Sequence, residues 1–198
     1  PLRFLQDVKA ILAEDGVFVI QMNYLTDMLR GRTYDNIGHE HVAYYSLESL
    51  FNILNEAGLK PFRVESNGVN GGSIRVYIQH WSKPYRTDSY LPEIVAGEKL
   101  NVSNSFLLRG FHESVAEGTT KLRRFIESEL EKGAVTYVYG ASNRGNTILQ
   151  YAGLNHELIA YAADRNPRKH GRYTVGTHIP IVSEAQFRKD SPDYALVL

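Results

Sequence analysis

The sequence predicts an α/β protein made of two segments. In the first, an amphipathic helix is followed by a continuous apolar run at residues 17–20, which is typical of a strand buried on both faces. In the second, strands and helices alternate from residue 135 to residue 198, as in a small Rossmann-like parallel sheet. The chain has 198 residues, 43% of them hydrophobic, which is enough to fill a core in each segment.

The first segment begins with a helix that ends near residue 12, because apolar side chains recur there at helical spacing. We expect the strand at 17–20 to run parallel to its neighbours. Residues 23–45 show little periodicity and are rich in Tyr, Asp, Asn, Gly and His, which indicates a long loop with one short helix at 25–29. Loops of this length usually carry function.

Ser46 is placed to cap a second helix, and Gly58 is placed to end it. Residues 62–66 and 74–79 then alternate apolar and polar side chains across a glycine-rich stretch at 68–72. This pattern predicts a β-hairpin.

Pro84 and Pro92, with polar residues between them, mark a linker over residues 81–100. The predicted domains are therefore 1–80 and 101–198. Since the chain does not start with Met and ends in a strand pattern, we expect it to be a fragment at both ends.

The second segment opens with a long helix at 104–132, either continuous or interrupted near Gly110 or Gly118, and closed by Gly133. The elements expected after it are a strand at 135–139, a helix at 147–152, strands at 158–163 and 179–182, a short helix, and a final buried strand at 193–198.

Charge and composition exclude several classes of protein. Lys and Arg total 22 and Asp and Glu total 22, so there is no basic field to attract nucleic acid or an anionic membrane. Without cysteine the chain has no disulfides, no thiolate nucleophile and no cysteine-ligated zinc. No apolar run approaches the ~20 residues of a membrane helix, and we expect a cytoplasmic protein.

The motif His39-Glu40-His41 lies in the long loop. Two histidines could bind a metal, but no other His or carboxylate lies at a spacing typical of a third metal ligand, so we expect no metal site. Histidine can instead act as a general base near neutral pH, oriented by a carboxylate. A polar loop that caps the following helix explains the motif equally well.

Residues 140–146, Gly-Ala-Ser-Asn-Arg-Gly-Asn, stand between a predicted strand and a predicted helix, where backbone N–H groups commonly bind phosphate. Asp164 follows at about the ~20-residue distance of a ribose-binding acid. Ser142 replaces the middle glycine of the dinucleotide fingerprint, which favours a phosphate or diphosphate over NAD. A purely structural turn is nearly as well supported. Arg165, in the charged run that follows, could face an anion or belong to a solvated loop.

Together, the stretches at 34–46, 70–76, 139–146, 163–167 and 176–183 resemble the S-adenosylmethionine-dependent sugar C-methyltransferases. Members of this family have a zinc-binding segment, a central class I methyltransferase domain and a C-terminal Rossmann-like domain. The resemblance implies that this chain holds the end of the central domain and most of the C-terminal one. The glycine-rich loop that binds S-adenosylmethionine would lie upstream, in an N-terminal part of the same protein that is missing here.

The resemblance also implies the reaction: methylation, through an enolate, of the carbon next to the ketone of a nucleotide-linked 4-keto-deoxysugar, usually carbon 3. It assigns His41 as the base that takes the α-proton and Glu40 as its partner. The best-known members have Tyr where this chain has Gly38, so Tyr24, Tyr44 or Tyr45 would have to supply the phenol.

At the nucleotide-sugar diphosphate, the resemblance points to five residues of the glycine turn: Gly140, Ser142, Asn143, Gly145 and Asn146. A second departure from the family pattern is Val175, where proline is common. We expect the chain alone to be inactive. Two alternatives stay open: an NAD-dependent oxidoreductase built on residues 140–164, and a non-catalytic module that binds a sugar nucleotide.

Overall fold

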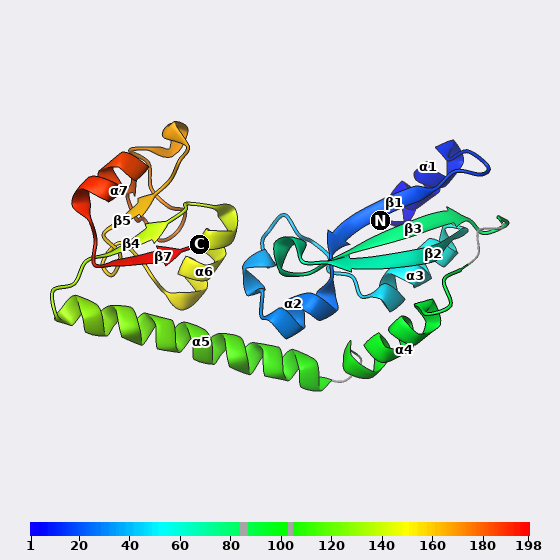
Figure 1. Ribbon diagram of the computed structural model, residues 1–198, viewed down its shortest axis with the longest axis horizontal. Helices are drawn as coiled ribbons and strands as arrows, with labels where there is room; N and C mark the ends of the chain where they lie inside the picture. Colours follow the sequence, from blue (N-terminus) through cyan, green and yellow to red (C-terminus); the bar gives the residue numbers. More distant parts are fainter. Residues whose placement is uncertain (84–86, 103–104) are drawn as a thin grey trace. The chain divides into compact units, whose positions relative to one another are not determined.

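The chain forms two compact units in the computed structural model, which describes residues 1–83, 87–102 and 105–198 (Figure 1). Pro84 and Asn104, used above to mark the linker and the start of the long helix, lie outside the described residues. The units differ from the predicted segments because each is discontinuous in sequence. Unit 1 comprises Pro1–Thr33 and Ala43–Phe111, and unit 2 comprises Tyr34–Val42 and His112–Leu198.

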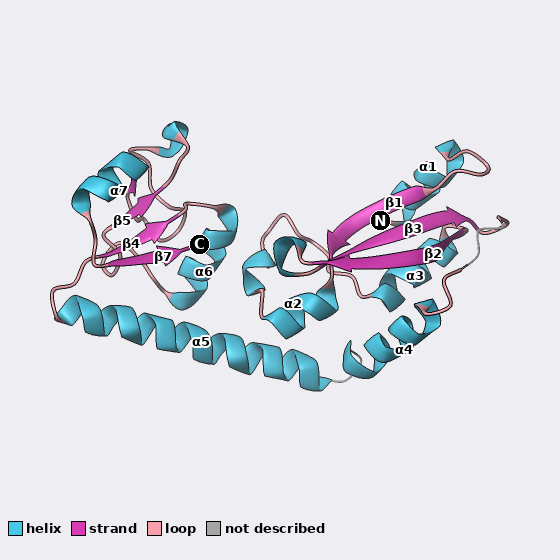
Figure 2. Cartoon of the chain, in the orientation of Figure 1, coloured by secondary structure: helices cyan, strands magenta, loops and turns pink. Residues whose placement is uncertain are grey.

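Unit 1 is built on a three-stranded antiparallel sheet with the order β1-β3-β2 (Figure 2). Since β3 pairs antiparallel with both neighbours, β1 and β2 run in the same direction. The elements of unit 1 are α1 (Leu2–Ile11), β1 (Phe18–Asn23), α2 (Leu25–Gly31), α3 (Leu47–Glu56), β2 (Leu59–Asn67), η2 (Val69–Gly71), β3 (Ser73–His80) and α4 (Leu91–Val102).

The local signals of the sequence predicted α2, α3 and the hairpin correctly. The Ser46 hydroxyl accepts a hydrogen bond from the Ser49 backbone N–H at 3.1 Å and so caps α3. After α3, Gly58 turns the chain with φ +74°, a conformation that favours glycine. The hairpin pairs Asn67 with Ser73 next to its turn.

The prediction that residues 17–20 form a strand buried on both faces, parallel to its neighbours, is wrong. β1 pairs antiparallel with β3. Val17 and Val19 are 38% and 44% exposed, whereas Phe18 and Ile20 pack against the core. A short apolar run does not reveal whether one face or two will be covered, because that depends on distant parts of the chain.

Helix α4 lies inside the stretch predicted as a linker and brings the buried carboxylate of Glu98 to the start of α3. Its Oε1 accepts hydrogen bonds from the Leu47 N–H at 2.7 Å and from the Thr26 hydroxyl at 3.2 Å. Its Oε2 accepts the Glu48 N–H at 2.9 Å. Glu98 therefore satisfies two of the N–H groups that a helix N-terminus leaves without a partner inside the helix.

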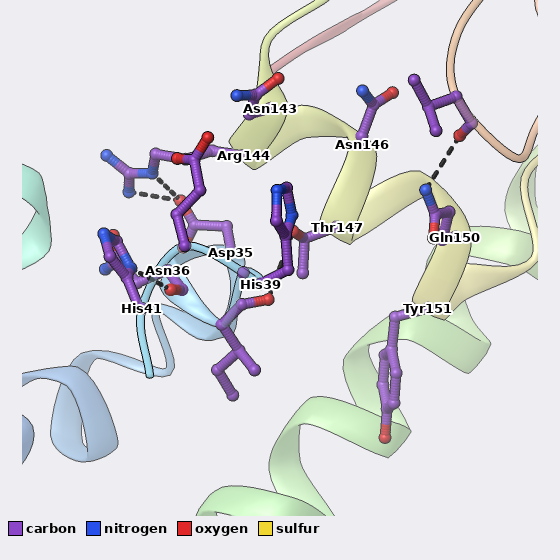
Figure 3. A pocket seen from close by; sticks show the side chains of 14 residues that line it. Asp35, Asn36, His39, His41, Asn143, Arg144, Asn146, Thr147, Gln150 and Tyr151 are labelled. Carbon is purple, nitrogen blue, oxygen red and sulfur yellow. Dashed lines mark hydrogen bonds and ion pairs between the residues drawn. The ribbon is translucent and has the colours of Figure 1, made fainter. Parts of the chain in front are cut away.

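Unit 2 contains a parallel sheet, as the sequence predicts, and its four strands have the order β6-β5-β4-β7. Residues 34–42, the 34–42 loop, lie against α6 (Figure 3). Helix α5, Ser105–Glu131, continues through Gly110 and Gly118, and the division between the units falls within it. The other elements are η1 (Tyr34–Asn36), β4 (Thr136–Tyr139), α6 (Asn143–Ala152), β5 (Tyr161–Ala163), η3 (Pro167–Lys169), β6 (Ile181–Val182), α7 (Glu184–Asp190) and β7 (Tyr194–Val197).

Two details of unit 2 differ from the prediction. The final strand is not buried: β7 is at the end of the strand order, and Val197 is 73% exposed. Helix α6 starts at Asn143 instead of residue 147, because the Ser142 hydroxyl caps it by accepting the Gly145 N–H at 2.9 Å.

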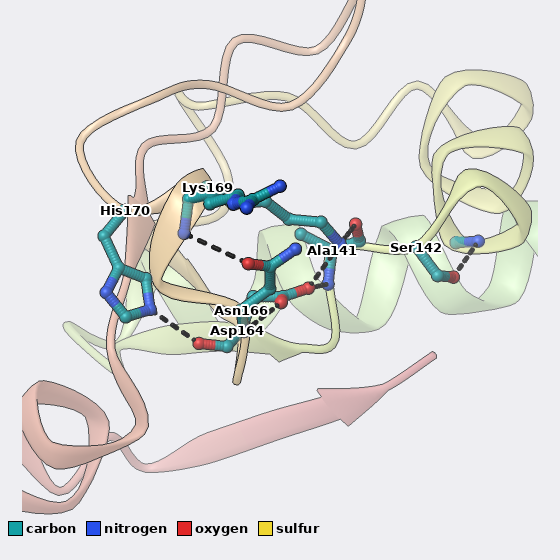
Figure 4. A network of polar contacts seen from close by, with 8 residues as sticks. Ala141, Ser142, Asp164, Asn166, Lys169 and His170 are labelled. Atoms are coloured by element: carbon teal, nitrogen blue, oxygen red, sulfur yellow. Dashed lines mark hydrogen bonds and ion pairs between the residues drawn. The ribbon is translucent and has the colours of Figure 1, made fainter.

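The carboxylate of Asp164 ties the end of β5 to the turn that follows β4 (Figure 4). Oδ2 accepts hydrogen bonds from the Ala141 N–H at 2.9 Å and the Lys169 ammonium at 2.8 Å, and Oδ1 accepts the Asn166 N–H at 2.8 Å. Burial raises the pKa of Asp164, but the bonds from Lys169, Asn166 and Ala141 outweigh it, so the pKa lies below its ordinary value.

Replacing Glu98 by alanine should lower the free energy of unfolding of unit 1 by roughly 2–4 kcal/mol, since it leaves buried donors at the start of α3 without their acceptor. Urea unfolding followed by the fluorescence of Trp81, the single tryptophan, which lies in unit 1, measures this change. The control is Glu93→Ala, at an exposed position on the same helix, which should change stability by less than about 0.5 kcal/mol. Equal losses in the two variants would contradict the assignment.

Asp164→Asn should destabilise unit 2 by about 1–3 kcal/mol at neutral pH. Because the folded pKa is lowered, the contribution of Asp164 is complete above about pH 4, the unfolded value, and is lost as the pH falls through the folded pKa. Unfolding curves recorded by circular dichroism from pH 7 to pH 2 should therefore converge for the two proteins. Glu117→Gln, at an exposed ion pair on α5, is the control; a difference that did not change with pH would argue against a charged Asp164.

Candidate functional site

The 34–42 loop carries the His39-Glu40-His41 motif and lies against α6 in unit 2 (Figure 3). In sequence the loop stands between two helices of unit 1, α2 and α3. The motif's three side chains are exposed, whereas Asn36, at the end of η1, is buried. The loop is therefore anchored in unit 2 at its buried residue Asn36, and the side chains of the motif extend into solvent.

Three contacts join the loop to one face of α6. The Arg144 guanidinium donates through Nε to Asp35 Oδ2 at 2.6 Å, and its Nη2 contacts the same oxygen. The rings of Tyr34 and Tyr151 are 5.5 Å apart between centroids. The third contact is a long hydrogen bond of 3.5 Å from the hydroxyl of Thr147 to the carbonyl of residue 37.

The Tyr34 and Tyr151 rings pack against each other in a tilted arrangement. Burial raises the pKa of the Tyr34 phenol above its ordinary value, and the nearby carboxylate of Asp35 and the Tyr151 phenol raise it further. Tyr34 therefore stays neutral over the physiological range, and its ring serves in packing.

The His41 ring has a fixed tautomer in its neutral form. Its Nδ1 lies 2.7 Å from the backbone carbonyl oxygen of Asn36. Because a carbonyl oxygen can only accept a hydrogen bond, Nδ1 carries the proton and Nε2 is left with its lone pair. The geometry thus gives His41 one nitrogen that can take a proton from a ligand.

A pocket of about 610 Å³ lies between the loop and α6 (Figure 3). His39, Glu40 and His41 line it from the loop, and Asn143 and Asn146 line it from the helix. The structure therefore brings the histidine motif together with part of the glycine-turn motif.

Both positions at which the sequence departs from the family pattern, Gly38 and Val175, also line this pocket. The Val175 carbonyl accepts a hydrogen bond from the Gln150 side chain at 2.9 Å, which joins its turn to α6. The Oδ1 atom of Asn146 is buried and has no hydrogen-bond partner among the described residues. The pocket thus contains one acceptor that a ligand hydroxyl or N–H could satisfy.

Four predicted substrate residues, Gly140, Ser142, Gly145 and Arg165, are not among the described residues that line the pocket. Ser142 and Gly145 bond to each other in the helix cap. Gly140 has φ +107°, and a Cβ there would come within 2.7 Å of the Leu198 carbonyl oxygen. The three residues of the turn thus have structural roles in the chain itself.

Arg165 is largely solvated, with 88% of its side chain exposed, and it pairs with Glu184 at 3.3 Å. The two tyrosines predicted to bind substrate, Tyr24 and Tyr44, belong to unit 1. Tyr24 is 7% exposed, and burial raises its pKa strongly. Tyr44 is half-buried. A substrate role for these residues stays a prediction.

Sequence reasoning missed the side chains of α6 that contact the loop. Arg144 stands inside the predicted motif, but no role was assigned to it. Arg144, Thr147 and Tyr151 recur at helical spacing, so they share one face of the helix. Applying helical periodicity to polar as well as apolar residues would have grouped them.

The described residues show neither a metal-binding cluster nor a membrane-spanning helix. Within residues 1–83, 87–102 and 105–198, no three His, Asp or Glu side chains come together as a group that could hold a metal ion. None of the helices in the same ranges has the length and apolar character needed to cross a membrane.

Two comparisons with known proteins relate this chain to C-methyltransferases. A family model described as C-methyltransferase C-terminal domain matches residues 68–198. The chain is also 31% identical over 195 residues to the C-methyltransferase NovU of Streptomyces niveus, in an alignment that covers 98% of this chain and 46% of that protein. It therefore spans about half the length of this curated relative. The chain belongs to the C-methyltransferase family, and its residues 68–198 match the C-terminal domain of that family.

Proposed function

We propose that this chain is the C-terminal part of an S-adenosylmethionine-dependent C-methyltransferase that acts on a nucleotide-linked 4-keto-deoxysugar, at carbon 3. The observation that carries the proposal is the 2.7 Å hydrogen bond between His41 Nδ1 and the Asn36 carbonyl, which leaves Nε2 able to accept a proton. Membership of the C-methyltransferase family supports the same reaction class.

In the proposed reaction, His41 Nε2 removes the proton from the carbon next to the ketone. The electron pair of the broken C–H bond moves onto the ketone oxygen and gives an enolate. The enolate carbon is thereby made nucleophilic. S-adenosylmethionine, when bound to the longer protein, would supply the methyl group to that carbon, and the electrons of the broken bond would remain on its sulfur.

A neutral imidazole is a weak base for a carbon acid, so the enolate oxygen requires hydrogen-bond donors. The pocket offers the side-chain amides of Asn143 and Asn146. We propose that they contact the substrate, and that Gly140, Ser142 and Gly145 support it indirectly by fixing the start of α6. Glu40 lines the same pocket and is proposed as the second polar group beside His41.

We assign no contact with the methyl donor to this chain, because its sequence contains no glycine-rich loop of the kind that we expect to bind it. The residues present fit the substrate half of the reaction: a pocket, a base with a fixed tautomer and amide donors. Methyl transfer is therefore proposed for the longer protein.

The contacts of Asp164 argue against the NAD-dependent alternative. In a dinucleotide site an acid at this position binds the ribose hydroxyls. Here both oxygens of Asp164 accept hydrogen bonds from Ala141, Asn166 and Lys169. Ser142, in place of a fingerprint glycine, is occupied as the cap of α6. The site would have to break these bonds to admit a ribose.

In the full-length protein, His41→Gln should lower kcat for methyl transfer about 100-fold or more, because the general base is lost, and change KM little. The measurement is transfer of a radiolabelled methyl group to a nucleotide-linked 4-keto-deoxysugar. His112→Gln, at an exposed position on α5, is the matched control and should retain full activity. Unchanged turnover in His41→Gln, with binding that still needs unit 2, would favour the non-catalytic binding module.

Calorimetric titration of this chain should show saturable binding of thymidine diphosphate and none of S-adenosylmethionine or NAD. Asn146→Ala should weaken the affinity for a nucleotide-linked 4-keto-deoxysugar by about 1 kcal/mol or more, since an amide proposed to contact the sugar is removed, and should change the affinity for thymidine diphosphate little. Saturable NAD binding would instead support the oxidoreductase reading and contradict the assignment of Asp164 as a structural tie.

A further inference from the structure

We propose that α6 positions the base: Arg144 holds the 34–42 loop so that His41 keeps the tautomer in which Nε2 accepts the substrate proton. This inference rests on the proposed function, because it assigns a purpose to the orientation of His41. It makes Arg144 a positioning residue, which acts on the reaction through the loop and not by contact with the reacting atoms.

The first step of the argument is the ion pair between Arg144 and Asp35. Two nitrogens of the guanidinium contact one carboxylate oxygen, Nε at 2.6 Å. The Asp35 side chain is 16% exposed, so its charge is partly removed from water and depends on this partner. Two guanidinium nitrogens that converge on one oxygen hold the side chain in place more firmly than a single contact would.

The second step leads from Asp35 to His41 through one carbonyl group. Asp35 precedes Asn36, whose carbonyl oxygen accepts both the Gly38 N–H at 3.0 Å and the His41 Nδ1–H at 2.7 Å. The His41 N–H in turn donates to the Gly38 carbonyl at 3.0 Å. In so tight a turn, a displaced Asp35 would rotate the carbonyl away from the imidazole.

The third step is that α6 contacts the loop at positions on both sides of the ion pair. Tyr151 packs on Tyr34, and Thr147 reaches the carbonyl of residue 37. On the loop these two positions flank Asp35, and on α6 both contacts lie C-terminal to Arg144, so the three contacts hold η1 along one helix face. Each of these contacts is weak alone, and the ion pair between Arg144 and Asp35 is the one that fixes the orientation of the 34–42 loop.

The sequence predicts a diphosphate site at the start of α6, but in the structure two of the groups there form contacts within the chain itself. The Gly145 N–H is taken by the Ser142 hydroxyl, and Arg144 is engaged by Asp35. An anion bound by Arg144 would compete with the loop for that side chain. We therefore infer that Arg144 serves the loop, and that the nucleotide is held by other groups.

The test uses the full-length protein with ¹⁵N-labelled histidine. In the unmodified protein, the His41 ring should show one neutral tautomer, protonated at Nδ1. In Arg144→Met it should show a mixture of both tautomers, and kcat should fall about 10- to 100-fold, with KM for the sugar nucleotide changed less than about twofold. Arg188→Met removes a different ion pair of unit 2, at an arginine whose side chain is 73% exposed, and should change neither readout.

Two further variants keep the test decisive if Arg144→Met does not fold. Asp35→Asn should give the same tautomer mixture and loss of kcat, and Arg144→Lys, which retains the charge without the fork, should fall in between. The double variant Asp35→Asn with Arg144→Met should lose no more than either single change, because both remove one interaction.

The inference is overturned if His41 keeps one tautomer in these variants, or if the tautomers mix while kcat stays the same. Absence of methyl transfer in the unmodified protein would contradict the proposed function and not the positioning role of Arg144. In that case the tautomer measurement alone still decides whether Arg144 holds the loop.

Discussion

The register at which α6 begins is the constraint on which the site of unit 2 depends. Asp164 accepts the Ala141 N–H and thereby fixes the turn after β4, and Ser142 then starts the helix. Each residue of an α-helix is rotated by about 100° from the one before it. A shift of one position in the start would turn Arg144 and Tyr151 away from the 34–42 loop, and the pocket between loop and helix would lose its wall.

Most of the fold was predictable where the deciding interactions are local in sequence. The cap at Ser46, the left-handed glycine at Gly58 and the alternating hairpin strands each act within a few residues, and each prediction is confirmed. The errors concern burial. The apolar residues of β1 and β7 predict buried strands, but which faces of a strand are covered is decided by elements elsewhere in the chain. Helix α4 was missed because its apolar pattern is weak and because Pro92, which lies in its first turn, was interpreted as a linker residue.

The candidate site was predictable in its parts and not in its assembly. The histidine motif was singled out because of its chemistry, and Asn143 and Asn146 because they follow a strand. That these residues line one pocket depends on a contact between segments far apart in the sequence, which no local pattern encodes. The tautomer of His41 depends on a backbone carbonyl, and backbone groups are the same at every position of a sequence.

Unit 2 is discontinuous: the chain passes between the units after Thr33, after Val42 and after Phe111. Its C-terminal stretch is consequently not a self-contained cassette. If recombination exchanged residues 112–198 between two family members, it would bring in a new α6 but leave the old loop behind. Only exchanges that matched both partners, Asp35 on one side and Arg144 on the other, would retain the contact. The topology thus requires that these two distant positions change together if the contact is to be kept.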